Sequence, residues 1–231
     1  MIQAPAIHKE VLRDKIFEVL KTWILDGTLK PGERIVEYTL ASRLNVSRAP
    51  LREALWLLSN RGLVTIKAHH GTFVTQLSEQ DILDIFEVRE ALETCAARKI
   101  RASLTPEKRD QLRKAMAELE NAGQERDMAR FSDADHAFHG ALAALCENRH
   151  IEGALRDLSA RFFGYELIRD VPHAEIFRFD DMVRDHRRMI ELILKGDERA
   201  IDEGYRAIFA GFREHLLERF RSHQERPREN P

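Results

Sequence analysis

The stretch Glu37–Gly62, EYTLASRLNVSRAPLREALWLLSNRG, decides the fold of the N-terminal part of this chain. Its first half has apolar side chains at helical spacing, at Leu40, Ala41 and Leu44. The helix that they predict stops at Asn45, a residue type that tolerates the left-handed conformation of a sharp turn. The stretch therefore predicts a short helix followed by a tight polar turn.

A second helix is predicted to begin at Arg48, after that turn. Ser47 is a good N-cap, and Pro50 falls in the first turn, where its missing N–H removes a donor that a helix leaves unpaired. Arg48 and Arg52 share a face away from the apolar stripe, where two cations suit phosphate oxygens or guanine edges in a DNA major groove. The alternative is a helical hairpin with solvated arginines. The apolar stripe consists of Leu51, Leu55 and Leu58.

Two β-type runs follow the second helix, at residues 63–66 and 72–75. The polar turn between them includes Lys67, His70 and Gly71, so the runs predict a hairpin with a basic tip. Helix, turn, helix and hairpin in this order predict a winged helix-turn-helix. Its wing tip would reach an adjacent groove or phosphate strand.

The sequence LKPGERIVEYTLASRLNVSRAPLREALWLLSNRGLVTIKAHHGTFV resembles the DNA-binding domain of the GntR family of transcriptional regulators. The resemblance covers about residues 10–77 and includes the PGERI and VSR-x-PLREAL patterns. It implies that Arg34, in PGERI, contacts the operator. The predicted DNA contacts come from the PGERI motif, the start of the second helix and the wing tip. They are Arg34, Ser47, Arg48, Ala49, Arg52, His70 and Gly71.

Charge divides the 231 residues unevenly. Through Leu77, eleven Lys and Arg stand against seven Asp and Glu, a balance of +4, and the total of −2 leaves −6 for the rest. A basic module joined to an acidic one suits a nucleic-acid reader attached to a domain with another partner. Cys95 and Cys146 lie in helical patterns among apolar residues and are expected to be reduced core residues.

The predicted organisation is mainly α-helical. We expect a mobile N-terminus at 1–8, the winged domain at 9–77, an effector-binding and dimerisation domain at 78–221, and a disordered tail at 222–231. The first helix of the winged domain is expected at 9–26, and the second domain is expected to be an antiparallel helical bundle. Its six helices are predicted at residues 79–102, 106–122, 127–146, 150–168, 176–195 and 197–224.

No apolar run approaches the roughly 18 residues that span a bilayer, and the N-terminus has no signal-peptide pattern. The chain is therefore expected to be cytoplasmic and to have no membrane partner.

Three ionisable residues fall on the apolar stripes of the helical half. Asp135 and His139 are four residues apart on one helix, and His186 lies on the inward stripe of another. A carboxylate and two imidazoles converging from two helices can bind a divalent transition metal. A buried Asp–His hydrogen-bond pair is the alternative.

The segments EVREALETCAARKI, DADHAFHGALAALCENRHI and DHRRMIELILKGDERAI resemble the FCD effector-binding domain of FadR-type GntR regulators, in its six-helix VanR-like variant. The resemblance implies a metal, zinc or nickel, held by Asp135, His139, His186 and a fourth residue. Ile208 occupies that fourth place, so the sequence departs from the pattern. His215, seven residues further on, would lie about 10 Å away along a helix and does not replace it. A metal-free regulator of the same family is therefore an alternative interpretation of the sequence.

Arg89 interrupts an apolar stripe and needs an anion. It either pairs with Glu93 on the next turn or grips a ligand carboxylate, and the second role makes it the predicted effector-binding residue. We therefore expect a repressor that binds a palindromic DNA operator as a homodimer and responds to a small organic acid. An Asp/His/His metalloenzyme is the rival from another class, but it leaves the winged helix unexplained, so the chain is not expected to be an enzyme.

Overall fold

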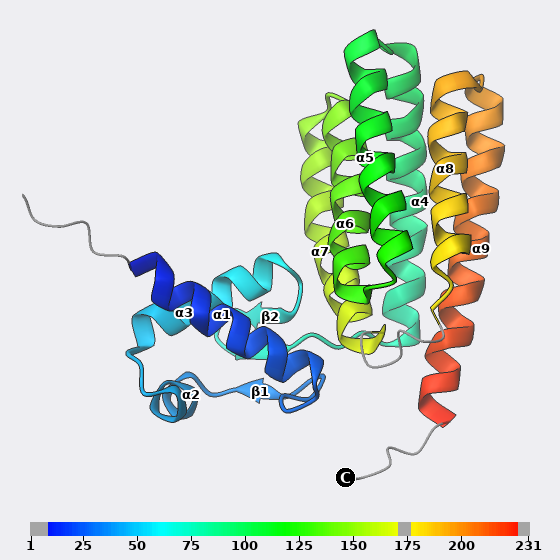
Figure 1. Ribbon diagram of the computed structural model, residues 1–231. Helices are drawn as coiled ribbons and strands as arrows, with labels where there is room; N and C mark the ends of the chain where they lie inside the picture. Colours follow the sequence, from blue (N-terminus) through cyan, green and yellow to red (C-terminus); the bar gives the residue numbers. More distant parts are fainter. Residues whose placement is uncertain (1–8, 171–176, 226–231) are drawn as a thin grey trace, which may run out of the picture. The chain divides into compact units, whose positions relative to one another are not determined.

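The computed structural model describes residues 9–170 and 177–225, which form two compact units (Figure 1). The first unit comprises residues 9–76 and 160–170, and the second comprises 77–159 and 177–225. The last turns of the helix that crosses residue 160 are thus grouped with the first unit, although the sequence assigns them to the second domain. The expected mobile N-terminus at 1–8 lies outside the described residues.

The first unit is a winged helix-turn-helix. Helix α1 packs against α3, α2 packs against α3, and α3 packs against β2. Leu20, Leu51 and Leu58 have no exposed surface in this core, and Ile24 has 1%. The elements are α1 (Lys9–Leu25), β1 (Arg34–Ile35), α2 (Glu37–Leu44), α3 (Arg48–Asn60), β2 (Val64–Lys67) and β3 (Gly71–Val74).

The wing differs from the predicted hairpin by one strand. The sheet has three strands in the order β1-β3-β2, and both neighbouring pairs are antiparallel. Arg34 pairs with Phe73 and Ile35 pairs with Thr72, which ties the segment before α2 to the wing. A strand of two residues is too short to show an alternating pattern, so sequence periodicity does not predict it.

The second unit is an antiparallel bundle of long helices. The side chain of Ser78 accepts a hydrogen bond from the backbone of Asp81, whose own side chain accepts one from Ser78, so α4 begins with a capping box. Thr105 and Asp127 cap the next two helices through their side chains. The helices are α4 (Glu79–Ala102), α5 (Pro106–Glu125), α6 (Met128–Leu145), α7 (Arg149–Asp170), α8 (Phe179–Lys195) and α9 (Glu198–Glu225), and the part of α7 after residue 159 is grouped with the first unit.

Within this bundle, α5 packs against α6 and α8, and α4 packs against α6, α8 and α9. Helices α4, α6 and α8 therefore enclose a common interior (Figure 1). The predicted mainly α-helical class is confirmed, and the six predicted helices agree with the observed ones to within a few residues. Helix α9 continues to Glu225, so residues 222–225, which were expected to belong to a disordered tail, are helical.

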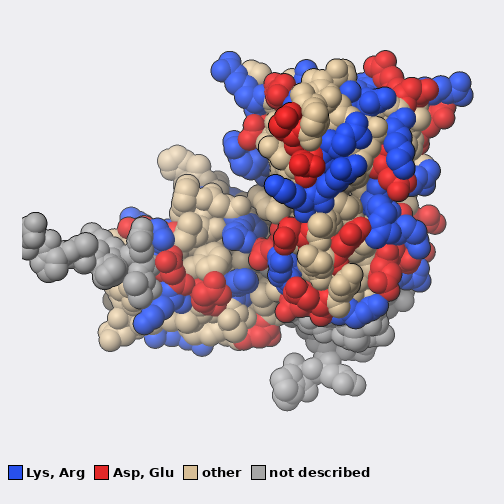
Figure 2. All heavy atoms as spheres, turned by 45° about the horizontal axis from the view of Figure 1, so that its top comes forward, with Lys and Arg blue, Asp and Glu red and all other residues tan. Residues whose placement is uncertain are grey.

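The surface of the bundle is mixed in charge. Figure 2 shows Lys and Arg interleaved with Asp and Glu over this unit. Exposed ion pairs join neighbouring helices, including Arg187–Glu120 at 2.7 Å and Arg126–Asp180 at 2.8 Å. No described helix is both long enough and apolar enough to cross a membrane. Because solvent and exposed ion pairs account for the surface charges, the charged residues that need a functional explanation in this unit are the buried ones.

Candidate functional site

The turn between α2 and α3 forms as the sequence predicts. Asn45 has φ 50° and ψ 48°, the left-handed conformation that ends α2. Ser47 is the N-cap residue of α3, as predicted, although its side chain makes no capping hydrogen bond. The extended backbone of Ser47 and the position of Pro50 suffice to start the helix, and the Ser47 side chain is exposed.

The predicted DNA contacts at the start of α3 are brought together on one exposed end of the helix. Ser47, Arg48, Ala49 and Arg52 are all exposed. The two arginines share one acidic neighbour that sequence reasoning did not identify. Oε2 of Glu37, in the first turn of α2, lies 2.6 Å from Nε of Arg52 and 3.5 Å from Nη2 of Arg48.

The remaining predicted contacts gather at the wing. His70 is exposed at the turn between β2 and β3, and Gly71 has φ +106°, which side chains of L residues rarely adopt. A Cβ atom at Gly71 would lie 3.4 Å from Nε of Arg34. Arg34 therefore lies beside the wing, and the predicted contacts form two groups within this unit.

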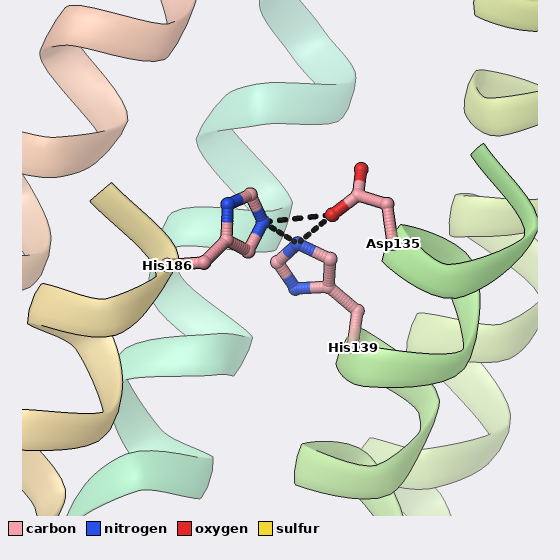
Figure 3. Close-up of side chains that lie close together, drawn as sticks. All are labelled: Asp135, His139 and His186. Atoms are coloured by element: carbon pink, nitrogen blue, oxygen red, sulfur yellow. Dashed lines mark hydrogen bonds and ion pairs between the residues drawn. The ribbon is translucent and has the colours of Figure 1, made fainter. Parts of the chain in front are cut away.

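The second site lies inside the bundle, where Asp135 and His139 of α6 meet His186 of α8 (Figure 3). Nε2 of His186 lies 2.7 Å from Oδ1 of Asp135 and 3.1 Å from Nε2 of His139, and the third separation, His139 Nε2 to Asp135 Oδ1, is 3.6 Å. All three residues are buried, with exposed fractions of 6% or less. A tetrahedral ion bound at about 2.1 Å would hold its ligand atoms about 3.4 Å apart. The separations of 3.1 and 3.6 Å are close to this value, whereas 2.7 Å between His186 and Asp135 is a hydrogen-bond distance that would lengthen by about 0.7 Å around a metal.

Both imidazole rings are oriented by hydrogen bonds at their other nitrogen. Nδ1 of His139 lies 2.8 Å from Oε2 of Glu93, and Nδ1 of His186 lies 2.7 Å from the carbonyl oxygen of Met182. Each partner is an acceptor, so each Nδ1 donates and each neutral ring turns the lone pair of Nε2 toward Asp135. Three electron pairs converge on one point, which calls for a proton or a metal cation.

Protonation of the cluster follows the same geometry. For Asp135 and His186 burial is the largest influence and opposes charge, but their mutual attraction and hydrogen bond outweigh it. The pKa of Asp135 is therefore lowered and that of His186 raised. Burial lowers the pKa of His139. The lowered pKa of Asp135 and the raised pKa of His186, together with the 2.7 Å contact between the two side chains, favour a proton on Nε2 of His186 that is donated to Asp135 when no metal is bound.

Arg89 forms the pair with Glu93 that the sequence left open. Its Nε lies 2.9 Å from Oε1 of Glu93, and the side chains have exposed fractions of 3% and 2%. Burial, the largest influence, raises the pKa of Glu93, but His139 and Arg89 together bring it from 4.5 to about 2. Glu93 therefore joins Arg89 to the ring of His139, and the positive charge of Arg89 is already balanced.

Helix α9 supplies the remaining side of this interior. Ile208, at the fourth place of the family pattern, is 3% exposed and offers no ligand atom. The ring of Phe212 lies 5.3 Å from that of His186, and Arg89 lies over the ring of Phe209 at 5.9 Å. Tyr205, on the same stripe of α9, is fully buried, and its hydroxyl has no hydrogen-bond partner among the described residues.

Two residues of this interior were missed as functional residues by sequence reasoning. Glu93 lies on the buried stripe of α4 with Phe86 and Arg89, so its position on the helix was a usable signal. Tyr205 gives no such signal, because tyrosine is common in apolar cores. Within residues 9–170 and 177–225, Asp135, His139 and His186 form a group that could hold a metal ion, and their ligand atoms lie within 4.8 Å of one another.

Comparison with known proteins matches both parts of the chain to family models. Residues 12–74 match the model "Bacterial regulatory proteins, gntR family", and residues 84–211 match the model of the FCD domain. The chain is 30% identical over 206 residues to the uncharacterized HTH-type transcriptional regulator YdhC of Bacillus subtilis, covering 87% of this chain and 89% of the relative. It is 23% identical over 191 residues to the HTH-type transcriptional repressor RspR of Escherichia coli, and the match covers 83% of this chain and 82% of RspR.

The fold is also found among solved structures. The crystal structure of a transcriptional regulator GntR from Rhodococcus sp. RHA1 matches with a TM-score of 0.65 and 22% sequence identity. The match covers 89% of this chain and 97% of the other. This likeness supports the fold, a winged helix-turn-helix followed by a helical domain.

Proposed function

The chain belongs to the GntR family of bacterial regulatory proteins and carries an FCD effector-binding domain behind its DNA-binding domain, and from that membership we propose how it is regulated. We propose that it is a metal-dependent repressor that binds a palindromic operator as a homodimer and changes its operator affinity when a small organic acid binds the FCD domain. The matched domains and relatives are transcriptional regulators, which rules out the metalloenzyme alternative.

The convergence of Asp135, His139 and His186 is the observation that carries the proposal. Both histidines donate from Nδ1 to fixed acceptors, so the tautomer that a metal needs is already selected. Zinc or nickel would be held by one carboxylate oxygen and two Nε2 atoms. Ile208 leaves the fourth position to water or to a ligand, as in sites that bind exogenous molecules.

The charge of the site supports an anionic effector only together with a metal. Glu93 balances Arg89, and Asp135 adds a further negative charge, so the interior favours cations while both imidazoles are neutral. A divalent cation reverses this balance, and a carboxylate then has a favourable partner. The hydroxyl of Tyr205 stays protonated, because burial raises its pKa, and it is a suitable donor to a second effector oxygen.

Arg89 keeps its proposed role with a restriction. A carboxylate would have to approach a guanidinium that already donates to Glu93 through Nε. Arginine has five N–H donors, so a second acceptor is chemically compatible with that pair. The proposed effector-binding set is therefore Arg89 and Tyr205 beside the metal.

The homodimer and the repressor role have different support. One winged helix contacts too few base pairs for specific binding, and paired domains read symmetric half-sites. Repression is proposed by analogy with RspR, which is named a repressor. The effector would act by binding one arrangement of the DNA-binding domains better than another.

The test uses the full chain and an operator selected from random duplex DNA by the purified protein. Operator affinity is measured for chelator-treated protein and for protein reloaded with zinc or nickel, each with and without a panel of organic acids. We expect an acid that changes the affinity of the metal-loaded protein about 5- to 150-fold, the usual range of allosteric coupling. An equal response from the chelated and loaded forms would contradict the metal dependence, and no response to any acid would contradict the effector class.

A further inference from the structure

Glu37 connects the two arginines of the recognition helix to the helix before it. One oxygen of its carboxylate, Oε2, accepts a hydrogen bond from Nε of Arg52 at 2.6 Å. The same oxygen lies 3.5 Å from Nη2 of Arg48. Glu37 is in the first turn of α2 and both arginines are in the first half of α3, so the contact spans the helix-turn-helix.

Stability does not explain this arrangement. The side chains of Arg48 and Arg52 are 57% and 59% exposed, and that of Glu37 is 26% exposed. Exposed ion pairs of this kind contribute little to stability, because water screens the charges and the side chains lose conformational freedom. The hydrophobic contacts of Leu51, Leu55 and Leu58 hold α3 in place independently of the pair.

The atoms involved suggest a different role. Bidentate recognition of guanine needs two parallel N–H groups directed at O6 and N7 of the base. The pair with Glu37 engages Arg52 at Nε, the inner side of the guanidinium, and leaves its Nη edge for such a contact. Arginine without this anchor has many side-chain conformations to lose when it binds a base.

We propose that Glu37 is a positioning and specificity-determining residue for operator recognition, which acts by orienting Arg52 and, more loosely, Arg48. This inference rests on the proposed role of the two arginines as operator contacts. Glu37 also places a negative charge beside two positive ones, which weakens attraction to DNA phosphates that carry no sequence information.

These two effects predict opposite changes when the charge of Glu37 is removed. In Glu37→Gln, Arg52 loses its anchor, so operator affinity should fall, by about three- to tenfold if part of a bidentate contact is lost. Affinity for unrelated DNA should stay the same or rise, because one repulsive charge is gone. A residue needed only for the fold would instead lower both affinities together.

The experiment measures the ratio of operator to non-operator affinity for the full-length protein. The operator is the sequence selected by the parent protein from random duplex DNA, and the competitor is a scrambled duplex of the same length. Glu53→Gln is the matched control, because Glu53 is an exposed acid on α3 and the described residues offer it no ion pair. We expect the ratio to fall in Glu37→Gln and to stay within twofold of the parent in Glu53→Gln. Equal ratios in all three proteins would overturn the proposal.

A double-mutant cycle separates this proposal from the one on which it rests. In an Arg52→Ala background, Glu37→Gln should change the ratio little further if Glu37 acts through Arg52. A full additional loss in that background would overturn the positioning role. If Arg52→Ala and Arg48→Ala both keep the operator affinity of the parent, the recognition role of α3 fails instead. Thermal unfolding of each variant shows whether the fold is retained.

Discussion

His139 and Glu93, which lie 46 residues apart in the sequence, share a hydrogen bond of 2.8 Å between Nδ1 and Oε2 in the interior of the helical unit. The other oxygen of Glu93 receives Arg89 at 2.9 Å. Glu93 therefore has two tasks, to balance a buried guanidinium and to orient a candidate metal ligand. The two tasks can be separated by experiment.

The first prediction concerns Glu93 and acid stability. Its pKa in the folded chain is lowered from 4.5 to about 2. The stabilisation that results, about 3 kcal/mol, is present above pH 4.5 and is lost as the pH falls through the range down to about 2. Denaturant unfolding of metal-free protein between pH 7 and pH 2 should show this loss in the parent and a much smaller one in Glu93→Gln.

At pH 7 the same variant should be less stable than the parent by about 3 kcal/mol or more, because the buried guanidinium of Arg89 loses the negative charge of Glu93. Its metal affinity should fall about 10- to 100-fold through the loss of ring orientation. Unchanged stability at pH 7 would show that Arg89 finds another anion. Unchanged metal affinity would show that Glu93 does not orient His139.

The second prediction concerns the metal. Protein prepared without chelator or affinity tag should contain up to one divalent ion per chain, and His139→Ala and His186→Ala should lose it. His150→Ala is the control, since His150 is exposed and lies outside the cluster. Elemental analysis measures the metal content, and thermal unfolding with added zinc or nickel measures its effect on stability. Negligible metal with no stabilisation would leave an Asp–His hydrogen-bond network as the correct description.

The third prediction concerns the recognition helix. Replacing Arg48 or Arg52 with Ala should cost about 1 to 3 kcal/mol of operator binding if the arginine reads a guanine. Arg13→Ala, which removes a charge from α1 in the same unit, serves as the control for general electrostatic attraction. Fluorescence anisotropy with operator and scrambled duplexes gives both affinities. Equal losses in all three variants, on both duplexes, would indicate attraction without base reading.

The fourth prediction concerns the wing. His70→Ala should weaken operator binding without changing thermal stability, because the side chain is exposed at the hairpin turn. A bulky residue at Gly71 should weaken it as well, but that change also strains the backbone at φ +106° and crowds Arg34. His70 is therefore the cleaner test. Footprints that protect the same nucleotides equally in parent and His70→Ala would remove the wing tip from the contact surface.

The fifth prediction concerns Tyr205. A buried hydroxyl left without a hydrogen bond costs about 1 to 3 kcal/mol, and Tyr205 finds no partner among residues 9–170 and 177–225, so Tyr205→Phe should raise the melting temperature of the effector-free protein. The increase in melting temperature produced by an active organic acid should become smaller, because the donor is gone. A variant that melts at a lower temperature than the parent, and responds fully to the acid, would show that the hydroxyl has another partner.

The sequence predicts the elements of this fold well because their signals are local. Asn45 ends α2 by its backbone preference, as predicted, and the helices predicted to begin at residues 79 and 106 begin there, after the capping side chains of Ser78 and Thr105. The short strand Arg34–Ile35 was missed because its hydrogen bonds are made to β3, far along the chain. Pairing between distant segments leaves no periodic trace in two residues.

The candidate sites also combine features that local sequence predicts with contacts between distant segments that it does not predict. Asp135 and His139 share a helix face, so their spacing alone predicts that they lie together, and the inward stripe of α8 predicts His186. The contacts that give these residues their chemistry cross between elements. Glu93 reaches His139 from α4, and Glu37 reaches Arg52 from α2. Helical periodicity shows which way a side chain points, but not which partner it meets there.

The negative charge of Asp135 has a consequence for how the metal and the organic acid would together change the operator affinity of such a regulator. A divalent cation gives the interior its positive charge and gives a carboxylate a favourable partner, so the proposed order of binding is metal first and organic acid second. Neither the metal nor the organic acid alone would then produce the full change in operator affinity. The operator affinity of the protein would then depend on two conditions in the cell, the supply of a transition metal and the presence of a metabolite. Because Ile208 provides no fourth ligand, the metal would bind more weakly and would be released easily when its supply falls.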